Sequence, residues 1–431
     1  MSVAVSAPGK VLLAGGYLVL ERKYTGLVFG LSARIHVLVS EINLGNQITV
    51  RSPQFVDAVW TYEFSVTEGK GVQISEVTDG VFKTSSPNRF VEMSLIFGLT
   101  YITAINGGNN KISPIEITIL ADTDYYSNTS EPSHIYPCFP FFNVPLSSAH
   151  KTGLGSSAAL VTALTTAILI NFIPAFDISA SLNKNKIHNL AQAAHCAAQR
   201  KVGSGFDVAA AVYGACIYRR FSPSILEGLN EPDTTDFAAH LKNIVENTKV
   251  WDAEIQNDTA ILPSGWELVM CDVDCGSSTV SMVKEVLKWR ENDAMTADKI
   301  WGELQNLQEN LIAQLKIANA QGIRQSLEKI RREIRKMSTL SGVPIEPPEQ
   351  TALLDAINSN VEGVIGGVVP GAGGYDAIVL LIENSKKTTG LLTAFLESWS
   401  AQNNGKFGLL GVKGESEGVR MEKYENYFER I

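Results

Sequence analysis

The sequence has 431 residues, of which 45% are hydrophobic and 19% charged, and its net charge at pH 7 is −9. This composition is typical of a globular protein long enough for two domains. The acidic balance argues against a general nucleic-acid binder, and an anionic substrate would need a local basic pocket.

Nothing in the sequence predicts disulfides, a signal peptide or a membrane span. Five cysteines, few and odd in number, fit reduced thiols in the cytoplasm better than a disulfide framework. Residues 1–20 carry no basic segment before their apolar ones. The apolar stretch 158–173 contains threonines and an asparagine, which favours a buried helix. We therefore expect a cytoplasmic protein without membrane insertion, and its oligomeric state stays open.

The first third of the chain is predicted to be rich in strands. The stretch "VSAPGKVLLAG", residues 5–15, predicts strand, turn and strand, and β-branched runs follow at 27–42 and 47–52. Residues 53–87 are polar and predict a hairpin. Apolar residues at helical spacing predict a helix over 88–105. The remaining elements of this half are a strand at 114–120 and helices at 156–171 and 182–200.

A polar connecting stretch, 222–262, precedes the second half of the chain. The elements predicted after it are a strand at 266–273, a helix at 278–291, a helical region at 296–340, and two strands around a glycine loop within 361–382. This pattern predicts three parts: an N-terminal domain over 1–225, a connecting segment over 226–262 and a C-terminal domain over 263–431.

Three glycine-rich stretches are spread across the chain. They are "APGKVLLAGGY" at 7–17, "TGLGSSA" at 152–158 and "PGAGGYDA" at 370–377. Each alone is weak evidence, because a glycine loop is more often a turn than a site. The second stretch lacks the lysine of the G-x-x-x-x-G-K-[ST] phosphate loop, yet it leads directly into an apolar helix.

We predict that this second stretch binds the phosphates of a nucleotide. The backbone N–H groups of a glycine loop and of a helix N-terminus both favour phosphate. A serine hydroxyl here is a hard oxygen ligand for Mg²⁺, and Ser156 is the candidate. The nucleotide-binding candidates are Lys151, Gly153, Leu154, Gly155, Ser156, Ser157 and Ala158.

The three stretches, in this order, resemble those of the GHMP kinases. The segments "SAPGKVLLAGGYLVLE", "KTGLGSSAALVTAL", "HNLAQAAHCAAQRKVGSGFDVAAAVYGACIYRRF", "CGSSTVSMVK" and "PGAGGYDAI" are similar to the phosphomevalonate kinase branch, particularly that of fungi. The resemblance extends from the N-terminus past residue 380.

This resemblance implies an α/β (α+β) fold of two domains. The N-terminal α/β domain would contain a left-handed βαβ unit, the C-terminal domain would be ferredoxin-like, and the active site would lie in the cleft between them. It also implies transfer of phosphate from ATP to (R)-5-phosphomevalonate, with Mg²⁺, in the mevalonate pathway to isoprenoids and sterols. Mevalonate kinase, mevalonate diphosphate decarboxylase and an inactive metabolite-sensing relative are the alternatives.

Two residues are predicted to be catalytic. Phosphoryl transfer depends on positioning and charge neutralisation, and Lys10 in the first stretch is the candidate for bridging two phosphates. Asp207 enters an apolar stretch, "GSGFDVAAA", where an aspartate is rarely present for solubility. It matches the aspartate that GHMP kinases place beside the acceptor, and we assign it to orienting the acceptor, Lys10 and Mg²⁺. A surface lysine and a helix cap are the alternatives.

The acceptor candidates are more widely spread. They are Lys10, Tyr17, Ser277, Ser278, Thr279 and Gly373. The two serines and the threonine open a helix after a strand, which suits an anion but equally suits ordinary capping.

The sequence departs from the family pattern at two positions. Several GHMP kinases use a glutamate for Mg²⁺ on the helix before the catalytic aspartate, whereas residues 183–206 contain no acidic side chain and His195 lies in that neighbourhood. Arg200 stands where related sequences more often have glycine. A glutamate ligand for Mg²⁺ is therefore not expected here.

Overall fold

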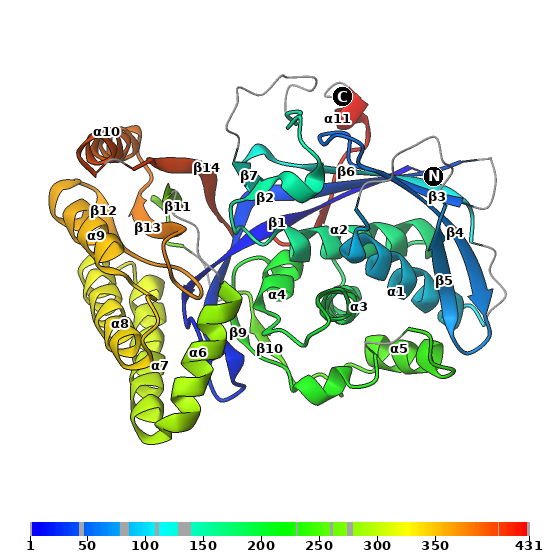
Figure 1. Cartoon of the computed structure of the whole chain (residues 1–431), viewed down its shortest axis with the longest axis horizontal. Coiled ribbons are helices and arrows are strands. Elements are labelled where there is room, and N and C mark those ends of the chain that lie inside the picture. The colour runs from blue at the N-terminus through cyan, green and yellow to red at the C-terminus, as the bar shows by residue number, and fades with distance from the viewer. Residues whose placement is uncertain are drawn as a thin grey trace.

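The computed structural model describes nine stretches of the chain. They are residues 2–42, 47–77, 86–107, 112–127, 139–229, 232–258, 262–273, 279–403 and 405–428. Within these stretches thirteen strands form one continuous sheet (Figure 1).

The N-terminal part of the sheet is built around the long strand β2. Its strands are β1 (Ser2–Ala14), β2 (Gly26–Glu41), β3 (Gln47–Arg51), β4 (Val59–Thr67), β5 (Gly71–Glu76), β6 (Ile115–Ala121), β9 (Cys216–Arg219) and β10 (Glu254–Gln256). Strand β2 pairs with β1 along nearly its whole length, and its other side pairs in turn with β9, β14 and β6. These pairs are antiparallel, whereas β3 and β6 are parallel and helix α1 lies between them in the chain.

Strand β1 is continuous, so the predicted strand, turn and strand was wrong. The pairing register with β2 shifts between Pro8 and Gly9, which marks a β-bulge rather than a turn. Gly9 is needed for close approach, because a Cβ atom there would lie 2.8 Å from the carbonyl oxygen of Leu154. The first glycine stretch therefore crosses the sheet directly beside the second.

Helices cover one face of this part of the sheet (Figure 1). They are α1 (Arg89–Ile105), α2 (Ser156–Phe172), α3 (Ser181–Gln199), α4 (Phe206–Tyr213) and α5 (Phe237–Glu246). Helix α2 packs on β1 and β2 and also touches α1, α3 and α4. It is apolar on all sides because it is buried on all sides. Shorter elements of the same part are η1 (Leu18–Leu20), η2 (Thr123–Tyr125), β7 (Tyr126–Ser127), η3 (Leu146–Ser148), β8 (His150–Lys151) and η4 (Pro223–Leu226).

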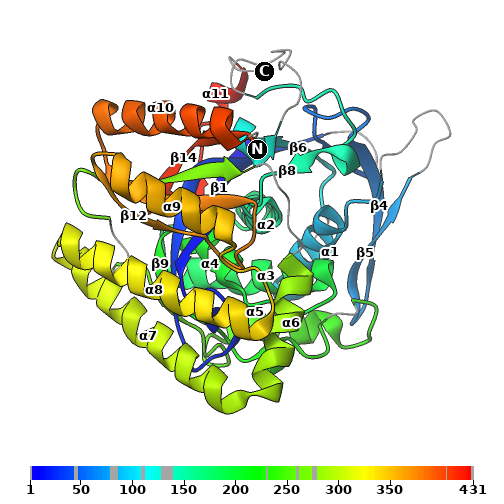
Figure 2. The ribbon, with the colours of Figure 1, turned by 60° about the vertical axis from the view of Figure 1, so that its left-hand side comes forward.

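The C-terminal part has the β-α-β-β-α-β order of a ferredoxin-like unit. Its strands are β11 (Trp266–Val273), β12 (Val364–Val368), β13 (Ala377–Glu383) and β14 (Phe407–Glu415). Its helices are α6 (Thr279–Asn292), α7 (Ala294–Lys316), α8 (Ala320–Ser341), α9 (Pro348–Asn360) and α10 (Lys386–Asn403). The strand order is β12-β13-β11-β14, all antiparallel, and β14 continues into the N-terminal part through β2. Figure 2 shows the long helices α7 and α8 side by side.

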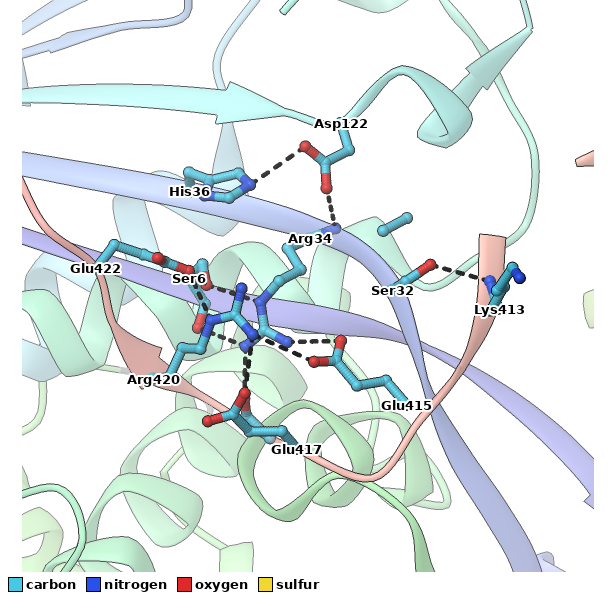
Figure 3. A network of polar contacts seen from close by, with 12 residues as sticks. Ser6, Ser32, Arg34, His36, Asp122, Lys413, Glu415, Glu417, Arg420 and Glu422 are labelled. Atoms are coloured by element: carbon cyan, nitrogen blue, oxygen red, sulfur yellow. Dashed lines mark hydrogen bonds and ion pairs between the residues drawn. The ribbon is translucent and has the colours of Figure 1, made fainter. Parts of the chain in front are cut away.

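The chain end returns to the N-terminal part of the sheet. Strand β15 (Arg420–Met421) pairs with β1, and α11 (Glu425–Phe428) follows. Buried Arg34 of β2 holds this return (Figure 3), since its guanidinium donates to Ser6 Oγ at 2.7 Å, to Gly418 O at 2.5 Å and to Glu415 Oε2 at 3.0 Å. None of the helices in the described residues combines the length and apolarity that a bilayer span requires.

Candidate active site

The second glycine stretch forms the loop that starts helix α2. Gly155 is the N-cap residue and adopts a left-handed conformation, with φ 85° and ψ 35°. The helix behind it is held in the core by fully buried residues such as Ala158 and Val161. Its first N–H groups are therefore fixed in space beside the loop, an arrangement that favours an anion.

Lys10 is tied to this loop by both its backbone and its side chain. The Lys10 N–H donates to Leu154 O at 2.8 Å, and Nζ donates to Gly153 O at 2.9 Å. Burial lowers the pKa of the Lys10 ammonium, while the Asp207 carboxylate acts in the opposite direction. The ammonium is thus held at the edge of the loop, where it can attract an anion.

Asp207 lies in the first turn of α4, which begins after a second left-handed glycine, Gly205. Its Oδ1 accepts from the N–H of Val208 at 3.0 Å. Gly205 occupies the N-cap position, so Asp207 is not the capping residue of this helix. Its side chain is about a quarter exposed (24%), which leaves the carboxylate accessible to a ligand.

His195 of α3 lies between Ser157, at the end of the second glycine stretch, and Asp207. Its Nε2 atom is 3.1 Å from Ser157 Oγ, 3.2 Å from Gln199 Nε2 and 3.9 Å from Asp207 Oδ2. Burial lowers the pKa of His195; Asp207 opposes the shift, and Lys201 adds to it. In the sequence, His195 lies in the neighbourhood where several GHMP kinases carry a glutamate for Mg²⁺. Its contact with Ser157 could not be predicted from the sequence.

The third glycine stretch lies against the first. The Tyr17 hydroxyl donates to Ala372 O at 2.7 Å, and the N–H of Gly371 donates to Leu12 O at 3.2 Å. Tyr17 itself has a left-handed backbone, with φ 61°. Gly373 packs on the backbone of Ile345, where a Cβ atom would lie 2.1 Å from the carbonyl oxygen. The second and third stretches, distant in sequence, therefore both lie against the first.

A cavity of about 560 Å³ opens beside the second glycine stretch. Its apolar walls include Phe55, Trp60, Phe90, Tyr126 and Leu160, and its polar lining includes Ser86, Asn88, Arg89, Lys151, Ser156 and Ser157. The rings of Phe55 and Tyr126 contact each other edge to face, with centroids 5.0 Å apart. An apolar pocket with a polar end next to a glycine loop suits a nucleotide.

Some of the other predicted site residues lie outside the described residues or have buried side chains. Ser277 and Ser278 lie outside the described residues, and Thr279 opens α6. Ala158 is fully buried, so only its backbone could face a ligand. Sequence reasoning missed the aromatic walls of the cavity, because they come from separate strands and loops and form no local pattern.

The oxygen donors near the loop fit a hard cation only in part. The Ser156 and Ser157 hydroxyls and the Asp207 carboxylate are the ligand type that Mg²⁺ prefers. Among the described residues, no group of three or more His, Cys, Asp and Glu side chains is arranged to hold a metal ion. One carboxylate and two hydroxyls match a metal that is held mainly by substrate phosphates.

The chain resembles known proteins over nearly its whole length. The family model described as GHMP kinases N terminal domain matches residues 141–215. A phosphomevalonate kinase of Gibberella zeae is 48% identical, over 99% of this chain and 98% of that protein. One of Aspergillus fumigatus is 46% identical, over 98% of this chain and 97% of that protein.

Solved structures share the fold at low sequence identity. Streptococcus pneumoniae phosphomevalonate kinase, in complex with phosphomevalonate and AMPPNP, matches with a TM-score of 0.62 and 16% identity, over 96% of this chain and 100% of that chain. Likeness at this identity shows the fold alone, and it confirms the two-part α/β architecture that the sequence predicts.

Proposed function

The chain belongs to the phosphomevalonate kinase family of the GHMP kinases, and on this basis we propose that it transfers the γ-phosphoryl group of ATP to (R)-5-phosphomevalonate. A phosphate oxygen of the acceptor forms the new bond to the γ-phosphorus, and the bond to the β–γ bridging oxygen breaks. The products are (R)-5-diphosphomevalonate and ADP. The observation that carries the proposal is the seating of Lys10 on the 153–155 loop, within electrostatic reach of Asp207.

The 560 Å³ cavity is the proposed nucleotide site. Its aromatic walls would hold the base, and the loop at the start of α2 would hold the phosphates through backbone N–H groups. Two cations line the same cavity, Lys151 and Arg89. In the described part of the chain, Nε of Arg89 is buried without a hydrogen-bond partner, and Nη2 of the same guanidinium donates to Ala197 O at 3.3 Å.

The proposed acceptor site is formed by Lys10, Tyr17, Gly373 and the start of α6. The attacking group is a phosphate that is already largely ionised near neutral pH, so a strong base is not required. Lys10 would reduce the repulsion between the two anionic substrates as they approach. Asp207 would hold the ammonium in place and orient the acceptor rather than remove a proton.

Mg²⁺ fits this site as an ion that arrives with ATP. Asp207 and the Ser156 hydroxyl would contribute oxygen ligands, and the nucleotide phosphates would contribute others. When bound, Mg²⁺ neutralises charge on the transferring phosphoryl group.

The compartment that we propose is the cytoplasm, which suits the free, buried thiols of Cys196, Cys216 and Cys271.

A coupled assay of ADP release tests the function. Purified protein with ATP and Mg²⁺ is given mevalonate, phosphomevalonate or diphosphomevalonate in separate reactions. We expect turnover with phosphomevalonate alone. Turnover with mevalonate, or release of CO₂ from diphosphomevalonate, would instead assign the chain to a different reaction of the superfamily.

A further inference from the structure

His195 is a buried polar contact between three helices of the site. Only 2% of the residue is exposed, and its ring lies 5.7 Å from the ring of Phe90, a wall of the nucleotide cavity. Ser157 belongs to α2, Asp207 to α4 and His195 to α3. The Nε2 atom of His195 is thus the point at which the nucleotide side and the acceptor side come together.

The neighbours of this nitrogen indicate how it is protonated. The Gln199 amide nitrogen lies 3.2 Å from Nε2, and with the amide in this orientation Nε2 accepts its hydrogen. Ser157 Oγ lies 3.1 Å from the same nitrogen, and because a neutral imidazole nitrogen has one lone pair, the hydroxyl and the amide share this acceptor. Asp207 Oδ2 lies 3.9 Å from Nε2, beyond hydrogen-bond distance.

An uncharged imidazole at this position suits a reaction between two anions. A carboxylate at this point would add negative charge beside Asp207 and the phosphates of both substrates, whereas an uncharged imidazole fixes the same geometry without repulsion. The side chains of Ser157 and Asp207 lie on separate helices that only packing would otherwise align. A displacement of about 1 Å between reacting groups can cost roughly 100-fold in rate.

We propose that His195 is a positioning residue for phosphoryl transfer, whose Nε2 atom sets the Ser157 hydroxyl on the donor side relative to Asp207 on the acceptor side. The proposal rests on the proposed function, since it concerns the same site. It assigns no proton transfer to His195.

The test compares two substitutions that differ in hydrogen bonding. His195→Phe keeps the ring and loses the nitrogen, and we expect kcat to fall about 10- to 100-fold while both KM values change less than about threefold. His195→Gln keeps a polar terminus near the Nε2 position, and we expect it to recover most of kcat. If the phenylalanine variant does not fold, His195→Asn replaces it, because its shorter amide does not reach that position.

The matched control is His188→Phe. His188 lies on the same helix, is equally buried at 2% and contacts Asn189, Tyr213 and Trp251 rather than the site. Its variant should lose stability without loss of kcat in the folded fraction. A second arm combines His195→Phe with Ser157→Ala, and the effect of the histidine change on kcat should then fall below about threefold.

Three outcomes would overturn the proposal: unchanged kcat in folded His195→Phe, equal losses in the phenylalanine and glutamine variants, or full additivity with Ser157→Ala. For each variant, kcat is compared with that of wild type, measured with the same substrates. If wild type did not phosphorylate phosphomevalonate, the proposed function would fail.

Discussion

Replacing Gly155 by alanine should slow phosphoryl transfer far more than it destabilises the fold. The residue has φ 85°, so alanine there costs about 1–2 kcal/mol of backbone strain. Its Cβ would also lie 2.8 Å from Lys10 Cγ. Lys10 cannot withdraw, because its N–H is bonded to Leu154 O, so its side chain must rotate and give up the contact of Nζ with Gly153 O. Displacing this ammonium should reduce kcat by about 100-fold.

The matched control is Gly342→Ala, at the end of α8. Gly342 has φ 70°, but a Cβ there meets nothing within 4 Å, so this variant carries the strain without the displacement of a side chain. Urea unfolding should give similar losses of stability for the two variants, and steady-state ADP release should separate them. A Gly155→Ala enzyme with kcat within about threefold of the control would refute the reasoning that Lys10 must occupy this position.

Three further predictions concern charge and metal. Asp207→Asn should lose most of kcat with little change in melting temperature; a variant that unfolds readily but stays active would make Asp207 structural. Ser156→Ala should raise the Mg²⁺ concentration for half-maximal activity more than the KM of phosphomevalonate, measured by Mg²⁺ titration, and an unchanged requirement would remove Ser156 as a ligand. Burial alone would raise the pKa of Glu422, but hydrogen bonds from Ser6 and Arg420 lower it below its ordinary value. Its ionised form therefore stabilises the fold above the unfolded-state pKa, and this stabilisation is lost as the pH falls through the folded-state pKa. Glu422→Gln should cost about 1–2 kcal/mol at pH 7, with the difference shrinking below about pH 4 in urea unfolding; a pH-independent difference would contradict the sign.

The topology of the C-terminal part could be predicted in outline. Strands were expected at 266–273 and on both sides of the loop within 361–382, and β11, β12 and β13 lie there. The helical region 296–340 is two helices, α7 and α8. The break between them could not be seen, because the residue in the left-handed conformation is Ala318 rather than a glycine.

The sequence predicted the candidate site only where a local motif marks its residues. The loop at 152–158 and Lys10 are marked by glycine and by resemblance, and the structure brings them within hydrogen-bond distance. The contact of His195 with Ser157 joins residues 38 positions apart on two buried helices. Side chains buried in this way show no period or motif in the sequence, so contacts of this kind require coordinates.

The central claim is that ATP phosphorylates a phosphate group, with Lys10 bridging the two anions. Phosphorus NMR of a reaction with ATP, Mg²⁺ and phosphomevalonate tests it directly, on wild type and on Lys10→Ala. The account predicts that wild type replaces the phosphomonoester resonance by the two coupled resonances of a diphosphate, and that folded Lys10→Ala does so about 100-fold more slowly or worse. Release of inorganic phosphate without a diphosphate product, or equal rates for the two proteins, would contradict it.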